Sequence, residues 1–134
     1  MRKLLAALLF FVCASAFGQN AQLISFTPTG KAITFTANTS GNIPTPVQAV
    51  SNQSPAQQNQ YLVVNTGVNL AFISYATTSA TATTNCVVPT GTSQPVVPVL
   101  AGSAVIFTTA GQAFFCGITS SGTSIVYVVP GNGL

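Results

Sequence analysis

Residues 61–76, with the sequence YLVVNTGVNLAFISYA, determine the fold that we expect for this chain. Two runs rich in β-branched and aromatic residues, Tyr61–Asn65 and Leu70–Ala76, lie on either side of a short stretch that contains Gly67. Such residues favour strands, and glycine permits the positive φ angle that a tight reversal can require. The stretch therefore predicts two strands joined by a tight turn.

The same kind of pattern continues on both sides of this stretch. Ala32-Ile33-Thr34-Phe35-Thr36 alternates between apolar and polar residues, as a half-buried strand requires. Strands at short, regular spacing indicate an all-β chain, and we predict a single small antiparallel β-sandwich, for which a jelly roll is one known connectivity. The further strands that we expect are Asn85–Val88, Val96–Leu100, Ala104–Thr108, Ala113–Ile118 and Ser124–Val129.

Three segments differ from this pattern. Residues 39–60 contain three prolines among Asn, Gln and Ser, and because proline cannot donate a ladder hydrogen bond, we expect a long surface connection with at most one short strand, at Val47–Val50. Ala76–Thr84 is compatible with a loop or with a single helical turn. The glycine-rich Gly131-Asn132-Gly133 predicts a flexible terminus.

Residues 1–16 have the layout of a secretory signal. Arg2 and Lys3 form a basic start, Leu4–Val12 is apolar, and Ala14-Ser15-Ala16 is a small-x-small cleavage site. The apolar run is too short to span a bilayer comfortably, so we expect membrane contact only through this segment. Cleavage at that site would leave a domain of residues 17–134. Retention of the segment as an apolar arm is the alternative.

Charged residues are almost absent beyond this segment. The chain has 3 Lys and Arg residues in total and is 2% charged, whereas about a quarter is usual. Because Arg2 and Lys3 lie in the signal-like segment, the predicted domain retains only Lys31. A nucleic-acid surface needs several contacts from Lys or Arg to phosphates, so we exclude DNA and RNA as direct partners. A surface with so little charge also lacks the repulsion that separates monomers, which favours a homo-oligomer or a larger assembly.

The composition also argues against catalysis. The chain contains no Asp, Glu or His, which removes paired-carboxylate glycosidases, Ser-His-Asp triads and two-metal phosphoryl chemistry. Zinc and calcium sites lack ligands for the same reason. We therefore predict no enzymatic activity, no cofactor and no metal site. Lys31 follows Gly30 at the start of an expected strand with no serine motif beside it, and we interpret it as a solvated turn residue.

Two cysteines lie beyond the signal-like segment. Cys86 and Cys116 form an even pair, which is compatible with a disulfide if the domain reaches an oxidising compartment. Two small buried thiols are the alternative. The sequence leaves both possibilities open.

Some of the expected strands are apolar on both faces. In Tyr61-Leu62-Val63-Val64 and Val105-Ile106-Phe107, only one face of each strand can meet the core of a two-layer domain. The second face needs a loop, another subunit or a partner to cover it. Tyr61, Tyr75 and Tyr127 could form a sugar-binding platform, but without carboxylates to accept sugar hydroxyls we interpret them as core or interface residues.

Short motifs in the C-terminal two thirds of the chain suggest a family. They are the turn Asn65-Thr66-Gly67, the stretch Val88-Pro89-Thr90 and the ending Tyr127-Val128-Val129-Pro130-Gly131. In these motifs the chain resembles the small β-sandwich virion proteins of tailed bacteriophages. That family includes capsid decoration or cement proteins, which lie on the outer capsid lattice and staple neighbouring shell subunits. The resemblance implies a structural protein of the virion, with shell subunits or further copies of itself as partners.

The secretory layout of residues 1–16 supports a second hypothesis. Phage heads assemble in the cytoplasm, and exported proteins do not join them. An exported bacterial β-sandwich, secreted or periplasmic after signal cleavage, would instead bind a partner or ligand at the cell surface. A retained apolar arm that serves for attachment would reconcile the signal-like segment with a virion.

Overall fold

The computed structural model describes residues 26–50, 60–91, 95–109 and 113–133. The signal-like segment 1–16 and residues 51–59 of the expected connection lie outside the described residues. The elements are, in chain order, β1 Phe26–Pro28, β2 Ile33–Thr39, β3 Val47–Ala49, β4 Gln60–Asn65, β5 Ala71–Ala76, α2 Ser79–Thr84, β6 Val97–Val99, β7 Ala104–Thr108, β8 Ala113–Thr119 and β9 Ser124–Gly133.

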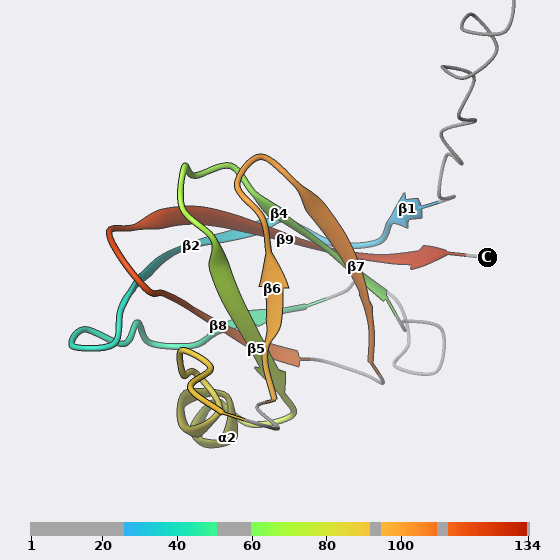
Figure 1. The fold of residues 1–134 in the computed structure, drawn as a ribbon. Coiled ribbons are helices and arrows are strands. Elements are labelled where there is room, and N and C mark those ends of the chain that lie inside the picture. Colours follow the sequence, from blue (N-terminus) through green and yellow to red (C-terminus); the bar gives the residue numbers. More distant parts are fainter. Residues whose placement is uncertain (1–25, 51–59, 92–94, 110–112, 134) are drawn as a thin grey trace, which may run out of the picture.

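The strands form one nearly closed sheet around a core (Figure 1). Their order is β6-β5-β8-β2-β9-β4-β7, with β1 paired to β9 and β3 paired to β8. The all-β prediction is confirmed. The expected antiparallel arrangement is only partly right, because Asn38 and Thr39 at the end of β2 pair with β8 in parallel, while residues 33–37 pair with β9 in antiparallel fashion. β2 thus joins two groups of strands into a single mixed sheet. The β-sandwich architecture and the jelly-roll connectivity stay predictions.

Alternation along each strand determines which side chains form the core. In β4, Tyr61, Val63 and Asn65 are buried, whereas Leu62 and Val64 are half-buried on the outer face. Because successive side chains of a strand point to opposite faces, an apolar run such as this one has apolar groups on both sides of the sheet.

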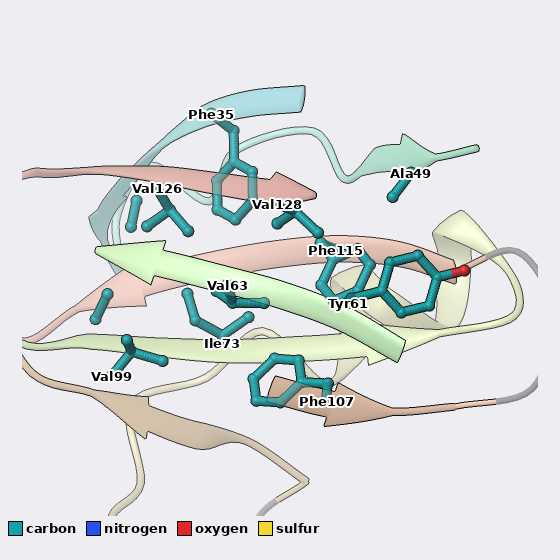
Figure 2. Packing of buried hydrophobic residues seen from close by; sticks show 12 residues of the cluster. Phe35, Ala49, Tyr61, Val63, Ile73, Val99, Phe107, Phe115, Val126 and Val128 are labelled. Carbon is teal, nitrogen blue, oxygen red and sulfur yellow. The ribbon is translucent and has the colours of Figure 1, made fainter. Parts of the chain in front are cut away.

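Aromatic rings fill one part of the core. The rings of Tyr61 and Phe115 meet edge to face with centroids 5.1 Å apart, and Figure 2 shows them side by side. Phe107 stacks on Tyr75 at 5.3 Å and on Phe115 at 6.2 Å. Edge-to-face and offset contacts of this kind add to the free energy of burying the rings. These four side chains come from β4, β5, β7 and β8, so they connect strands that are distant in the sequence.

The C-terminal residues form part of a strand, which differs from the prediction. Gly131-Asn132-Gly133 belongs to β9 and pairs with β1, a strand that the sequence did not predict. The predicted flexible terminus was therefore wrong for these residues. The physical reason lies in Gly131, because a Cβ atom at this position would collide with the ring of Phe26. The missing side chain lets the ring lie directly against the backbone of β9.

The stretch between β5 and β6 also differs from the prediction. Asn85–Val88, which we expected to be a strand, is not one; it follows the short helix α2 and contains Cys86. The undecided stretch Ala76–Thr84 contains that helix. Thr78 caps its start, since the Thr78 hydroxyl accepts a hydrogen bond from the backbone N–H of Thr81 at 3.2 Å.

Candidate protein-binding face

The chain covers one outer side of its sheet with its own residues. There, α2 packs against β5 and β8, and the Ser74 hydroxyl donates to the backbone oxygen of Ala82 at 3.0 Å. A small second core lies under this cover, separate from the main one. Its buried and partly buried members are Cys86, Cys116, Ile118, Phe72 and Val88.

A disulfide anchors this cover to the sheet. The sulfur atoms of Cys86 and Cys116 are 2.11 Å apart, and the Cα atoms are 5.8 Å apart. Both residues are fully buried. Of the two alternatives that the sequence left open, the structure therefore contains the disulfide. It joins the segment after α2 to the outer face of β8.

The outer face of the strands β2, β9, β4 and β7 is different. Tyr127 and Ile125 of β9 are 41% and 49% exposed, and the register places Val64 beside Tyr127, Leu62 beside Val129, and Ile106 beside Leu62. Since paired residues point to the same side of a sheet, these side chains form one continuous surface. We call this surface the β9 face; it consists of Leu62, Val64, Ile106, Ile125, Tyr127 and Val129.

The β9 face is uncharged and has no helix on it in the described structure. The described helix, α2, packs against β5 and β8 instead. Within the described residues, Lys31 is the sole charged side chain; it is exposed and lies before β2. Threonines at positions 34 and 36 of β2 border the apolar residues, since Thr34 pairs with Tyr127 and Thr36 with Ile125. The face is therefore an apolar surface with a neutral polar margin.

Two exposed apolar side chains lie on turns at one end of the sheet. Val68 is 87% exposed and Leu100 is 65% exposed. Their turns are connected by the buried side chain of Asn65, whose Nδ2 donates to the backbone oxygens of Asn69 at 2.8 Å and of Val99 at 3.0 Å. Because both oxygens bond to one nitrogen, Val68 and Leu100 are held in fixed turns close to each other.

The same end of the sheet adjoins the β9 face. The backbone N–H of Thr66 donates to the oxygen of Ile125 at 2.9 Å, and the Oδ1 of Asn65 accepts from the N–H of Gly67 at 3.0 Å. The turn Asn65-Thr66-Gly67 thus has a structural role, which is to fix the end of β4 against β9. Its hydrogen bonds are internal to the fold.

A shallow open pocket lies elsewhere, beside β6. It has a volume of about 400 Å³ and is lined by Tyr75, Pro95, Val96 and Val97. None of these four residues is charged, so they offer no charged group with which to orient a small ligand.

The other residues singled out by the sequence do not form a common site. Tyr61 is fully buried, Tyr75 is half-buried in the core, and Tyr127 lies on the β9 face. The three tyrosines therefore share no platform. Tyr61 and Tyr75 are core residues, and an interface role for Tyr127 stays a prediction. Lys31 is exposed, as expected of a solvated turn residue. The sequence indicated two-faced strands, but it did not show which of their faces the helix would cover.

In the part of the chain that the structure describes, no group of three or more Cys, His, Asp and Glu side chains is placed to hold a metal ion. No helix among the described residues is long and apolar enough to cross a membrane. Comparison with known proteins found no matching family model, no matching curated protein and no matching solved structure.

Proposed function

We propose that this chain is a non-enzymatic structural protein that joins a larger protein assembly through the β9 face. The observation that carries the proposal is the contrast between the two outer sides of the sheet. One side has a helix and a disulfide-bonded segment over it, whereas the other exposes Ile125 and Tyr127. Contiguous exposed apolar surface with a polar margin is typical of protein interaction sites.

The size of the β9 face supports an assembly of many copies over a single tight complex. The three strands that carry the β9 face and the neighbouring β2 with its threonine margin are spaced about 4.8 Å apart and are about five residues long here, which gives a flat area on the order of 300 Å². A stable pairwise interface usually needs about 800 Å² from each partner. Contacts of this small size become effective when many are made at once, because avidity multiplies weak affinities.

Capsid decoration is the assembly that we propose first. Decoration places many copies of a small protein on a repeating lattice, which matches a small apolar docking surface on a nearly uncharged domain. The turn Asn65-Thr66-Gly67 and the ending Tyr127-Val128-Val129-Pro130-Gly131 carry the resemblance to virion proteins. Shell subunits would be the partners in this role.

Mass spectrometry of purified virions tests the proposal. We expect to find many copies of the protein in each particle. Its absence from particles would end the virion role. Recombinant protein should also sediment with particles that lack it. Tyr127→Lys should weaken that binding at least about tenfold, because it places a charge in a desolvated contact. Thr84→Lys, an exposed position on the helix-covered side, serves as the matched control and should bind like the parent chain.

The disulfide favours a second candidate, an exported bacterial surface protein that binds a partner through the same face. Disulfides persist in oxidising compartments and are rare in the cytosol, and Cys86 and Cys116 are bonded here. Intact-mass analysis of the native protein separates the two candidates. A mass that starts at Phe17 with the disulfide present supports export, whereas retained Met1 and two thiols contradict it.

A further inference from the structure

The nearly closed sheet ends on two strands that are adjacent in the sequence but not paired with each other. β6 and β7 are joined by the turn Leu100–Ser103 and are the two ends of the strand order. In Figure 1 they separate from this turn onward. Among the described strands, β7 pairs with β4 alone. Its second edge therefore presents backbone N–H and C=O groups that no described strand uses.

β7 differs from the other strands that have one hydrogen-bonded neighbour. β1, β3 and β6 are three residues long, and β1 and β6 contain Pro28 and Pro98. Short length and proline are the usual means of protecting an edge from a further strand. β7 has five residues, Ala104–Thr108, with neither proline nor charge. Among these four strands, it has the least protected edge.

From these observations we infer that β7 is a self-association edge, which pairs in antiparallel fashion with β7 of a second copy of this chain. A twofold arrangement centred on Ile106 places Ile106 opposite its own counterpart, Val105 opposite Phe107 of the partner subunit, and Ala104 opposite Thr108 of the partner subunit. Apolar and aromatic pairs of this kind favour strand pairing. No like charges meet across the axis, because β7 has none.

An open pocket borders the start of β6, next to a ring that β7 contacts. Phe107 of β7 stacks on Tyr75 at 5.3 Å, and Tyr75 also lines the open pocket with Pro95, Val96 and Val97 at the start of β6. The open space therefore borders the start of β6 and the ring of Tyr75, which in turn contacts Phe107 of β7.

Pairing through β7 would also enlarge the docking surface, and this part of the inference rests on the proposed function. Ile106 belongs to the β9 face, so two faces joined at their Ile106 residues become continuous. The combined flat area rises from on the order of 300 Å² to on the order of 600 Å². That value approaches the area per partner in stable interfaces. Both the unprotected edge of β7 and the small size of the β9 face therefore favour a second copy of the chain as the binding partner.

Sedimentation velocity of the native protein between about 1 μM and about 1 mM tests the pairing. We expect a reversible monomer–dimer equilibrium. Ile106→Lys should raise the dimer dissociation constant at least about tenfold, because two lysines then face each other at the axis. The matched control is Leu62→Lys, which lies beside Ile106 on β4 with similar burial but away from the edge. It should leave the dimer intact, and circular dichroism confirms that each variant is folded.

A mixture of two variants tests the register. Ile106→Lys and Ile106→Glu should each be monomeric alone and should form a dimer when mixed, since opposite charges then meet at the axis. A monomeric native protein over the whole range overturns the inference, as does a dimer unaffected by Ile106→Lys or a mixture that stays monomeric. Leu62→Lys separates this result from the proposed function, because it should lose binding to particles while the dimer persists.

Discussion

The side-chain nitrogen of Asn65 donates a hydrogen bond to the backbone oxygen of Val99, which is 34 residues later in the chain, at 3.0 Å. The same nitrogen bonds to Asn69, and the side-chain oxygen bonds to Gly67. One buried amide therefore holds the turn after β4 and the end of β6 together. Few side chains other than Asn could do so, because the role needs two donors and an acceptor at short reach.

Asn65→Ala should lower the free energy of unfolding by about 2–3 kcal/mol, since it leaves buried backbone groups without their partners. Urea denaturation of the native and variant proteins measures the difference. Asn42→Ala, at an exposed turn position, should change stability by less than about 0.5 kcal/mol. Equal effects of the two substitutions would show that the Asn65 network contributes little.

Removal of the disulfide should also destabilise the protein. Cys86 and Cys116 are separated by 30 residues, and a cross-link across a loop of this length typically contributes about 2–4 kcal/mol. We expect Cys86→Ala to lower the free energy of unfolding by that amount, and reductant to have a similar effect on the native protein. Thermal unfolding with and without reductant measures it, and equal stability in both conditions is the contrary result.

Gly117→Ala should destabilise the core by about 1–3 kcal/mol through overpacking. A Cβ atom at Gly117 would lie 2.7 Å from the ring of Phe35 and 3.0 Å from Cδ1 of Ile73. Gly41→Ala is the control, because nothing lies within 4 Å of a Cβ atom there. This change should be neutral or slightly stabilising, since it restricts the unfolded chain. If both variants unfold at the same urea concentration as the parent, the core tolerates the added methyl group.

Gln60→Met should raise stability by about 1 kcal/mol, because the Oε1 atom of Gln60 is buried without a hydrogen-bond partner. Methionine keeps the length of the side chain and removes the unsatisfied oxygen. Gln48→Met provides the comparison, since Gln48 has an interaction partner and should show no gain. A loss of stability on Gln60→Met would mean that the oxygen is satisfied by water in solution.

Stability should be independent of pH between about pH 5 and about pH 7. The chain contains no Asp, Glu or His, which are the side chains that ordinarily titrate between about pH 3.5 and about pH 7. The folded and unfolded chains therefore bind the same number of protons in this window. Denaturation midpoints at several pH values provide the test, and a slope within the window would contradict the expectation.

Local sequence pattern predicted much of the fold. The runs Tyr61–Asn65 and Ala104–Thr108 are strands, because alternation and β-branched residues act locally. The strand expected at Asn85–Val88 is absent, since Cys86 is held against β8 by a contact that only the folded chain creates. β1 could not be predicted for a related reason. It depends on the packing of Phe26 against Gly131, more than a hundred residues away.

The candidate site was only partly accessible from the sequence. The second apolar side of Tyr61-Leu62-Val63-Val64 indicated that some surface would need a cover. Which surface it was depended on the placement of α2, and that placement is determined by contacts with β5 and β8. Tyr127 and Ile125 carried no local signal that distinguished them from core residues of β9. Their exposure follows from the register of β9 in the sheet, which determines the face to which each side chain points.

Because α2 and the disulfide both lie on one outer side of the sheet, the two outer sides of the molecule are different. A layer built through the β9 face would orient every copy alike, with the α2 side turned towards the solvent. The outer surface of such a layer would then contain short threonine-rich helices, each followed by a segment that a disulfide bonds to the sheet. The exposed residues of Ser79–Thr84 would then be part of the surface that an antibody or a protease meets first.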